Sequence, residues 1–258
     1  MSDKVDLYDE FASYYDKMVS WQPRFEAEAA FFRETFEKYR VKTIVDMACG
    51  TGMHAILFAR WGYRVVGVDL SEEMLRVAAD NVKKAGVHVD FRKAGFGELQ
   101  KSGFGQFDAI VCLGNSLPHI LTEKDMAQAL VDLRATLGSG GVFITQNRNY
   151  DLVWSKRDRF MRLDSAVSDD KELVFFRFLD FHADRITFNI VTLEKRGGEW
   201  SYKVTSTQHR PLFRDDVERM LLDAGFQDLG FYGDYARHGF DKEESGDLIV
   251  VARKSGRG

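Results

Sequence analysis

The amino-acid sequence predicts an α/β protein with a doubly wound, mainly parallel sheet of seven strands and an inserted antiparallel β cap. Three observations predict this fold. Apolar strand-like segments alternate with helix-like segments between residues 43 and 145, at the spacing typical of parallel sheets. A glycine-rich turn joins the first strand to the helix that follows it. Beyond residue 151 the pattern changes to long strand-like runs joined by short turns.

Composition and charge are typical of a soluble globular protein. The 258 residues are 45% hydrophobic and 29% charged, and the net charge of −4 gives no bulk attraction to nucleic acid or to a membrane. No apolar run reaches the ~18 residues of a membrane span, and the first residues lack the apolar core of a signal peptide. Cys49 and Cys112 fall at predicted strand ends, so we expect no disulfide and a cytoplasmic location. The oligomeric state stays open.

Residues 1–40 precede the first strand and are expected to form a helical lid. A break falls at Trp21–Arg24, because a proline disfavours helix in the residue before it, and a second helix is predicted from about Phe25. The two helices either cover the ligand-binding edge of the sheet or simply pack against the core. Apolar residues recur in them at spacings typical of one helix face, namely Tyr8, Phe11, Tyr15 and Met18, then Phe31, Phe32 and Phe36.

The core begins with residues 41–151, in which five strands alternate with helices. Ser71 and Thr122 are expected to cap the second and third helices, while Gly62 and Gly86 end the first two. A turn is expected at Gly138–Gly141. The predicted strands are Ile44–Met47, Arg64–Val68, Val87–Arg92, Phe107–Leu113 and Val142–Thr145, and the predicted helices are Met53–Trp61, 72–85 and 123–137.

The antiparallel cap occupies residues 152–207, between the fifth strand and the end of the core. Its three predicted strands are Glu172–His182, Arg185–Lys195 and Trp200–Thr207. The core pattern resumes over residues 208–253 with the helix Arg214–Ala224 and the strands Gln227–Tyr232 and Asp247–Arg253. These two strands bring the predicted core sheet to seven.

The turn after the first strand is predicted to bind a nucleotide-type cofactor. Gly50 and Gly52 allow positive φ and let a ligand lie against bare backbone. The next helix would present its unpaired N–H groups and the positive end of its dipole to that ligand. Ligands of doubly wound sheets bind beyond the carboxyl ends of the strands. Those ends are expected at Ala48, Asp69, Lys93, Leu113 and Asn147.

Two classes of cofactor fit this turn. Gly50–Ala55 satisfies the pattern G-x-G-x-x-A, and Asp69 lies 19 residues beyond Gly50, as in NAD-dependent oxidoreductases. Asp46, however, lies four residues before Gly50 and places a carboxylate beneath the turn. That charge favours a ligand with an ammonium and a sulfonium over a pyrophosphate. The chain also lacks an evident acid or base for hydride transfer beyond His119 and His209.

The runs V-D-M-A-C-G-T-G (45–52) and V-V-G-V-D-L-S-E-E-M-L (65–75) resemble the first two cofactor motifs of class I S-adenosylmethionine-dependent methyltransferases. The order of elements is similar to that Rossmann-like methyltransferase fold over most of the chain. The resemblance implies S-adenosyl-L-methionine as cofactor and S-adenosyl-L-homocysteine as product. The cofactor-binding residues that it implies are Asp46, Ala48, Gly50, Gly52, Asp69, Met74 and Leu113, and Arg24 and Leu70 are expected beside them. The exit of the third strand departs from the relatives, which often have an acid or amide there for the adenine amino group. This chain has A-G-F-G (94–97), so we expect backbone groups at Gly95 to meet the adenine, with Phe96 beside it.

The resemblance also implies a role for several of these residues. Asp46 supports the turn and the methionine end of the cofactor, and Asp69 accepts hydrogen bonds from both ribose hydroxyls. Met74 packs on the adenine, the Leu113 carbonyl accepts from the ammonium, and Arg24 lies near the cofactor carboxylate. From the residues alone, Asp69 could instead be an N-terminal helix acid and Met74 part of the core.

Two further strand ends resemble glycine N-methyltransferase and its sarcosine and dimethylglycine relatives. The fourth strand ends C-L-G-N-S-L-P-H (112–119) and the fifth Q-N-R-N-Y-D (146–151), where that group has C-L-G-N-S-x-x-H and H-R-N-Y-D. The resemblance implies that Asn115 points at the substrate and that Arg148 holds a substrate carboxylate. Arg148 could instead pair with Asp151 or an acid of the cap, and His119 could simply pack the loop.

The chain departs from that group around the expected methyl-transfer site. The cap run Thr205–His209 has no tyrosine, and Phe160 or Met161 stands where another tyrosine is expected. Tyr8, Tyr14 and Tyr15 of the lid are expected to supply the aromatic wall instead. We therefore expect a substrate larger or more apolar than glycine.

The sequence thus predicts methyl transfer from S-adenosylmethionine to the amine of an amino acid or other carboxylated amine, with Asn115, Arg148, Tyr15 and His119 at the reaction site. Methyl transfer from a sulfonium needs positioning rather than acid–base chemistry. The six histidines are scattered in sequence, so no metal is expected. The alternatives are O- or C-methyl transfer to another small molecule, an NAD-dependent oxidoreductase, and a cofactor-binding protein without activity.

Overall fold

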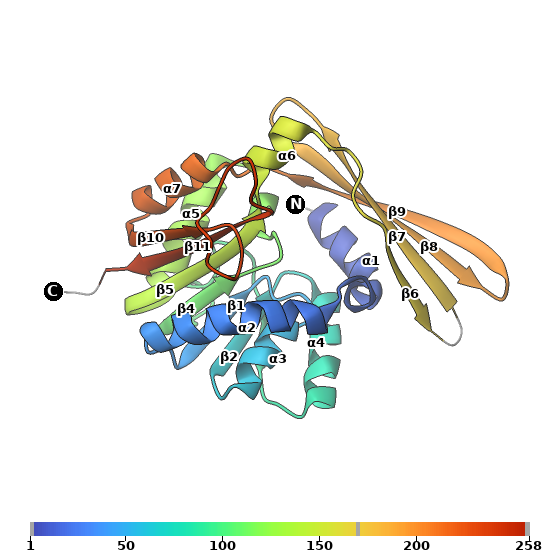
Figure 1. Cartoon of the computed structure of the whole chain (residues 1–258). Coiled ribbons are helices and arrows are strands. Elements are labelled where there is room, and N and C mark those ends of the chain that lie inside the picture. Colours follow the sequence, from blue (N-terminus) through green and yellow to red (C-terminus); the bar gives the residue numbers. More distant parts are fainter. Residues whose placement is uncertain (1–2, 169–170, 256–258) are drawn as a thin grey trace.

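The computed structural model describes residues 3–168 and 171–255, which form two separate sheets (Figure 1). The larger sheet has seven strands in the order β10-β11-β5-β4-β1-β2-β3, and the smaller has four in the order β6-β7-β8-β9. The strands are β1 (Thr43–Met47), β2 (Arg64–Asp69), β3 (Asp90–Lys93), β4 (Phe107–Cys112), β5 (Leu137–Arg148), β6 (Asp164–Ser168), β7 (Lys171–Phe181), β8 (Ile186–Arg196), β9 (Glu199–His209), β10 (Phe226–Tyr232) and β11 (Asp247–Lys254). The helices are α1 (Asp3–Met18), α2 (Trp21–Lys38), α3 (Met53–Arg60), α4 (Glu72–Ala85), the 3-10 helix η1 (Leu117–His119), α5 (Glu123–Thr136), α6 (Tyr150–Lys156) and α7 (Arg214–Asp223).

The larger sheet confirms the predicted doubly wound α/β fold. Its neighbouring strands are parallel except where β11 runs antiparallel to both β5 and β10. β1 pairs with β2 on one side and with β4 on the other, so the order of the chain reverses there. In such sheets ligands bind beyond the carboxyl ends of the strands at this reversal.

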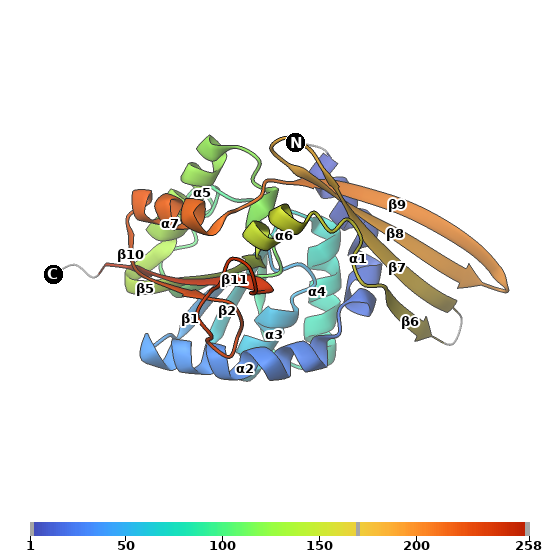
Figure 2. The same ribbon diagram turned by 45° about the horizontal axis from the view of Figure 1, so that its top comes forward.

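Alternate residues of β1 enter two different hydrophobic cores, one on each face of the sheet. Ile44 belongs to the core that includes Phe32 and Phe58, whereas Val45 and Met47 belong to the core on the other face. In Figures 1 and 2, α2 and α3 cover the first face, and α5 and α7 cover the second. Among the helices of the described chain, none is long and apolar enough to span a membrane.

Several boundaries differ from the prediction, and β3, for example, begins at Asp90 rather than at Val87. α2 begins at Trp21, not near Phe25, because Pro23 lies in its first turn, where a backbone N–H has no helical partner anyway. The turn expected at Gly138–Gly141 is part of β5 instead. The register of β5 against β4 shifts there, and Gly141 approaches the Asp108 carbonyl so closely that an added Cβ would lie 3.1 Å from its oxygen. Glycine thus permits an irregular strand rather than a turn.

The cap has four antiparallel strands instead of the three predicted. The additional strand, β6, has the sequence D-S-A-V-S, which lacks a run of β-branched or aromatic residues and acquires its conformation by pairing with β7. The short helix α6 was also not predicted. The Asn149 side chain caps it by accepting a hydrogen bond from the backbone N–H of Leu152, at 3.2 Å.

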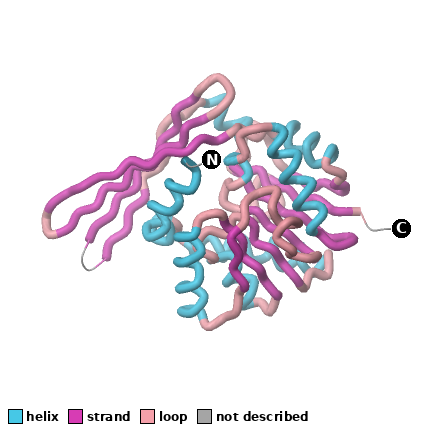
Figure 3. Tube along the Cα trace, turned by 180° about the vertical axis from the view of Figure 1, so that it is seen from behind, coloured by secondary structure: helices cyan, strands magenta, loops and turns pink. Residues whose placement is uncertain are grey.

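Helix α1 lies between the inner face of the cap and the core, and Figure 3 shows the cap extending past it, away from the larger sheet. Phe11 packs into a buried cluster with Leu173, Phe175 and Ile190 of the cap. On its other side Asp16 accepts a hydrogen bond from the Thr51 hydroxyl, at 2.5 Å. The helix therefore contacts both the cap and the turn that follows β1.

Candidate active site

Two adjoining cavities lie at the carboxyl ends of the central strands. The first cavity has a volume of about 440 Å³ and extends from the turn after β1 to the start of α5. The second cavity, of about 450 Å³, is lined by the ends of β4 and β5, by α1 and by the inner face of the cap. The two cavities meet at the residues that line both, which are Tyr8, Tyr15, Arg24, Gly114 and His119.

The turn between β1 and α3 forms one wall of the first cavity. Ala48 and Gly50 line the cavity and have φ values of +60° and +53°. Gly52, which we expected to bind the cofactor, does not line it. An added Cβ at Gly52 would lie 2.8 Å from the Phe91 ring, and its φ is +77°. Gly52 therefore closes the turn by packing against Phe91 rather than by meeting a ligand.

Asp46 is buried beneath this turn with part of its hydrogen-bonding capacity unused. The side chain is 2% exposed, and its Oδ2 atom has no hydrogen-bond partner among the described residues. Burial, followed by the nearby charge of Asp69, raises the pKa of Asp46 to about 8. A buried carboxylate oxygen without a partner is costly, and a cationic ligand would remove that cost. This feature fits a cofactor that carries an ammonium and a sulfonium.

Asp69 holds the turn through both of its carboxylate oxygens. Oδ2 accepts from the backbone N–H of Gly50 at 2.8 Å, and Oδ1 accepts from that of Ser71 at 2.9 Å. Burial raises the pKa of Asp69, although these hydrogen bonds oppose the shift. Each oxygen keeps a second lone pair, so Asp69 can still accept hydrogen bonds from a ligand diol.

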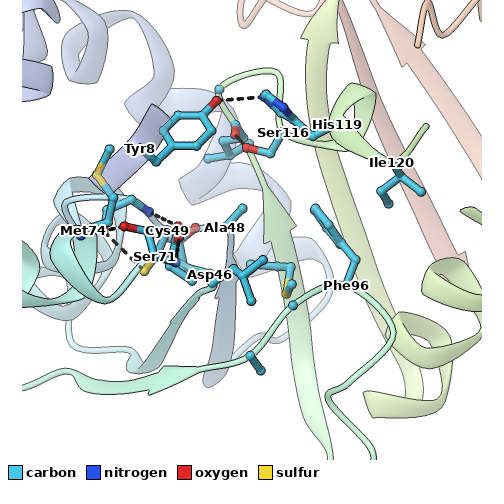
Figure 4. A pocket seen from close by; sticks show the side chains of 18 of the residues that line it. Tyr8, Asp46, Ala48, Cys49, Ser71, Met74, Phe96, Ser116, His119 and Ile120 are labelled. Atoms are coloured by element: carbon cyan, nitrogen blue, oxygen red, sulfur yellow. Dashed lines mark hydrogen bonds between the residues drawn. The ribbon is translucent and has the colours of Figure 1, made fainter. Parts of the chain in front are cut away.

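The other residues expected at the cofactor also line the first cavity: Arg24, Leu70, Met74, Gly95, Phe96 and Leu113. Figure 4 shows Phe96 and Ile120 across the cavity from Cys49 and Met74. The Leu113 carbonyl accepts from the Ser116 hydroxyl at 2.8 Å and keeps one lone pair. Several other polar residues of this wall were not predicted at the site. Ser71 and Ser116 lie inside the quoted motifs but had no assigned contact with the cofactor, and the remaining four lie outside any motif: Glu98, Lys101, Asp125 and Gln128.

Arg24 is fixed at the junction of the cavities by a buried chain of charged groups. Its Nε donates to Oε1 of Glu28 at 2.7 Å, and Nε2 of His54 lies 2.7 Å from Oε2 of the same carboxylate. Burial acts to raise the pKa of Glu28, but the hydrogen bond from His54 and the charge of Arg24 lower it overall. Glu28 is thus ionised and anchors Arg24 to α3 through His54.

Arg148 lines the second cavity without a carboxylate partner. No ion pair among the described residues includes it; its Nη1 lies 3.2 Å from the Met161 sulfur, and its guanidinium carbon lies 5.1 Å from the Phe188 ring centre. Burial lowers its pKa, as expected for an enclosed cation. Asp151, the alternative partner, instead accepts from the backbone N–H of Arg214 at 2.9 Å. Arg148 is therefore open to an anionic ligand.

Asn115 joins the ends of β4 and β5. Its Oδ1 accepts from the backbone N–H of Arg148 at 3.0 Å, and its Nδ2 donates to the Tyr150 hydroxyl at 3.0 Å. That hydroxyl lies 3.2 Å from Nδ1 of His209. The side chain lines the second cavity, as expected, but its position is set by these internal bonds.

Tyr8 and His119 link α1 to the loop after β4 across the junction of the cavities. The Tyr8 hydroxyl lies 2.7 Å from Nε2 of His119 (Figure 4). Nδ1 of His119 lies 3.4 Å from the Thr207 hydroxyl of the cap. His119, in the loop after β4, therefore contacts both α1 and the cap, and Tyr15 lines both cavities beside it.

Several residues that line the second cavity were not predicted from the sequence: Arg177, Phe188, Ile190 and His209 of the cap, and Gln146, Tyr235 and Asp247 of the core. The alternation of apolar and polar residues along β7 to β9 indicates that one face of the cap is buried, but it does not indicate which part of the chain covers that face. Asp247 pairs in register with Arg148 across β5 and β11, which only the paired strands reveal. Among the described residues, no group of three or more His, Cys, Asp or Glu could hold a metal ion.

Comparison with known proteins agrees with this geometry. A family model described as "Methyltransferase domain" matches residues 44–141. Glycine/sarcosine N-methyltransferase from Parasynechococcus marenigrum (strain WH8102) is 29% identical over 256 residues, covering 98% of this chain and 86% of that protein. The enzyme of the same name from Aphanothece halophytica is also 29% identical, covering 95% of this chain and 88% of that protein.

The fold is shared with solved methyltransferases. The crystal structure of an S-adenosylmethionine-dependent methyltransferase from Clostridium acetobutylicum ATCC 824 superposes with a TM-score of 0.77 at 20% identity, covering 96% of this chain and 99% of that one. Two enzyme classes fit the glycine turn. The domain match and the two relatives support the methyltransferase and not the NAD-dependent oxidoreductase. The chain is a methyltransferase that resembles the glycine/sarcosine N-methyltransferase group over most of its length.

Proposed function

We propose that this enzyme methylates the amine of a small carboxylated acceptor, an amino acid or a similar compound. The observation that supports this most directly is Arg148, a half-buried guanidinium that lines the second cavity and has no ion-pair partner among the described residues. An enclosed cation of this kind favours a ligand carboxylate, which arginine can bind through two parallel hydrogen bonds. The names of the relatives that are 29% identical over most of the chain agree with an amino-acid acceptor.

The first cavity is proposed to hold the cofactor. Asp46 and the Leu113 carbonyl would accept hydrogen bonds from its ammonium, Arg24 would meet its carboxylate, and Asp69 would meet its ribose. Bound S-adenosylmethionine supplies an electrophilic methyl group on a sulfonium. The junction at Tyr8 and Tyr15 would align this group with an amine in the second cavity.

The protein's part in the reaction is to position the acceptor and exclude water. Arg148 would fix the carboxylate, and its positive charge would favour the neutral form of a nearby amine, which alone has the lone pair needed for attack. The half-buried rings of Tyr8, Tyr15 and His119 around the junction would keep bulk water from the reacting atoms. These contributions require no nucleophilic residue and no metal.

The size of the second cavity favours an acceptor larger than glycine. Its volume, about 450 Å³, matches the about 440 Å³ of the first cavity, and Phe11, Met18, Phe188 and Ile190 give it apolar walls. Glycine would leave most of this space empty, and apolar surface that stays wet contributes no binding energy. A carboxylated amine with an apolar substituent would fill it.

A methylation assay tests the proposal. The protein would be incubated with methyl-labelled cofactor and a panel of glycine, sarcosine, dimethylglycine and larger carboxylated amines, with phenols and amine-free carboxylates as controls. We expect turnover with carboxylated amines and a higher kcat/KM for the larger ones. Activity on phenols or carboxylates, with none on amines, would select O- or C-methyl transfer instead.

The variant Arg148→Ala tests the carboxylate contact. Losing a buried charge pair of this kind typically costs about 2–5 kcal/mol, so the acceptor KM should rise by roughly 30-fold or more while the cofactor KM changes little. Arg219→Ala, a change on the exposed surface of α7, is the matched control and should leave both constants unchanged. An unaltered acceptor KM in Arg148→Ala would remove the central support for the proposal.

A further inference from the structure

The second cavity contains a buried histidine that no motif of the sequence marks as a substrate residue. His209 is the last residue of β9 and is 3% exposed. It lines the cavity, and its Nε2 atom has no hydrogen-bond partner among the described residues. Buried polar atoms in native proteins almost always have a partner, so an unpartnered ring nitrogen in a ligand cavity calls for one from the ligand.

The hydrogen bonds around His209 determine which ring nitrogen carries the proton. Oδ1 of Asn115 accepts from the backbone N–H of Arg148 at 3.0 Å, which fixes the amide so that Nδ2 donates to the Tyr150 hydroxyl, also at 3.0 Å. Nδ1 of His209, 3.2 Å away, is then the acceptor for the hydroxyl proton, because an Nδ1–H donor would leave that proton without a partner among the described residues. Because Nδ1 accepts, the neutral ring carries its proton on Nε2.

The surroundings keep this ring neutral. Burial lowers the pKa of His209 well below its usual value, and the nearby His119 and Arg148 lower it further. His209 thus holds a single N–H, at Nε2, and that group is the unpartnered one. The ring cannot add a second positive charge to the cavity near neutral pH.

Phe188 holds both His209 and Arg148 at the cavity wall. The His209 ring stacks on Phe188, with the ring centres 5.4 Å apart and the planes inclined by 18°. The Arg148 guanidinium carbon lies 5.1 Å from the centre of the same ring. The Nε2–H donor of His209 and the guanidinium donors of Arg148 therefore lie against one aromatic side chain, beside the cavity.

We propose that the Nε2–H group of His209 donates a hydrogen bond to an oxygen atom of the acceptor, as a second contact beside the Arg148–carboxylate pair. This inference rests on the proposed function and narrows the acceptor class to amines whose oxygen atoms can meet both donors. An amine without a carboxylate would leave the His209 donor and the Arg148 charge unsatisfied, and such unpaired groups are what make polar sites selective.

Two variants test this contact against a structural role. His209→Phe keeps a ring to stack on Phe188 but removes the donor, whereas His209→Gln keeps an N–H donor at the end of its side chain. In His209→Phe we expect the acceptor KM to rise by about tenfold or more, with the cofactor KM within about twofold of wild type. In His209→Gln most of the acceptor affinity should return. Thermal unfolding with S-adenosylhomocysteine verifies that both variants are folded.

Nitrogen NMR of protein labelled on histidine provides a readout that does not need turnover. The signals of the His209 ring are assigned as those that disappear in His209→Phe, and they should show the neutral Nε2–H form. Acetate added with S-adenosylhomocysteine should shift the resonance of the Nε2 proton. Three results would overturn the inference and leave the proposed function intact. They are a His209 ring protonated at Nδ1, an unchanged acceptor KM in His209→Phe, and a loss of acceptor affinity in His209→Gln as large as that in His209→Phe. Wild-type protein that methylates no carboxylated amine would overturn both.

Discussion

Asp46 and Arg148 are the two side chains from which the ligands of the cavities are inferred. Asp46 is a carboxylic acid beneath the first cavity and has one unpartnered oxygen. Arg148 is a cation beside the second cavity and has no ion-pair partner among the described residues. Each lies in surroundings that disfavour its charged form, since burial raises the pKa of Asp46 and lowers that of Arg148. A cationic cofactor and an anionic acceptor would relieve both costs.

The raised pKa of Asp46 should make cofactor binding depend on pH. Burial, and then Asp69, raise this pKa from 3.8 to about 8, so the ligand-free protein holds a proton there near neutral pH. A ligand ammonium favours the ionised form, so binding should release the proton. Affinity should then fall as the pH drops below about 8, by up to about tenfold per pH unit. Calorimetric titration with S-adenosylhomocysteine from about pH 6 to about pH 9 measures this.

Asp46→Asn is the control for this linkage. It should bind the cofactor more weakly and with an affinity that no longer follows pH. The Asp46 carboxyl has a pKa of 3.8 in the unfolded chain and of about 8 in the folded wild type. Between these two pH values the folded protein keeps a proton that the unfolded chain has lost, so the stability of the ligand-free protein should decline as the pH rises from 3.8 to about 8. Asp46→Asn should lack this decline. If the unfolding free energies of the two proteins changed equally with pH, a group other than Asp46 would be the one that titrates.

At the residue scale, the sequence predicted contacts that local motifs carry and missed those that folding creates. Ala48, Gly50 and Asp69 were expected at the first cavity, and they line it, because the turn and the strand end that place them are contiguous in sequence. His209 lies more than fifty residues from Tyr150, its partner, and no spacing rule relates the two. The side chain of Asn115 was expected to face the substrate, but its internal bonds could not be foreseen.

At the scale of single elements, the turn after β1 depends on close packing as well as on glycine's conformational freedom. Gly52 and Gly62 both have positive φ, but an added Cβ meets the Phe91 ring at Gly52 and nothing within 4 Å at Gly62. Gly62→Ala should therefore cost only the backbone strain, about 1 kcal/mol of unfolding free energy. Gly52→Ala should cost about 1–3 kcal/mol more because of overpacking, and urea denaturation of both variants measures the difference. Equal costs would show that Phe91 moves aside freely.

Helix α1 packs against the cap through aromatic side chains. Phe11 is 2% exposed, and its ring lies 5.9 Å from that of Phe175, nearly perpendicular to it. Phe11→Ala should weaken this docking by about 3–5 kcal/mol, raise hydrogen exchange along the helix and raise the KM for both substrates. Phe160→Ala, at a ring that is 60% exposed in the cap, is the control and should change none of these. Unchanged exchange in Phe11→Ala would show that α1 is held by its polar contacts instead.

Helices and strands that carry clear signals in their own sequence were predicted. Those that form only by hydrogen bonding to a neighbouring strand were not. β1, α3 and β2 follow from an apolar run, a glycine turn and a helix stop. β6 has no such pattern and exists because β7 offers it hydrogen-bond partners. The glycines before Val142 indicated a turn, but they serve an irregular stretch of strand next to β4, and the sequence alone does not distinguish these uses.

At the scale of the whole molecule, the second cavity is assembled from three parts of the chain. Helix α1 contributes Tyr8 and Phe11, the core contributes Arg148, and the cap contributes Phe188 and His209. The proposal that the N-terminal helices act as a lid follows from this arrangement, since removing α1 would open both cavities to solvent. The core could be predicted from sequence because its order of elements is regular, whereas the docking of cap and α1 depends on contacts between segments far apart in the chain.

The central claim is that Arg148 holds the carboxylate of an amine acceptor in the second cavity, next to the cofactor in the first. A crystal structure of the protein with S-adenosylhomocysteine and the best acceptor from the assay tests this most directly. We predict the acceptor carboxylate within hydrogen-bond distance of the Arg148 guanidinium, one oxygen within reach of His209 Nε2, and the amine directed at the cofactor sulfur through the junction near Tyr15. An acceptor bound elsewhere, or bound with its carboxylate turned away from Arg148, would contradict the claim.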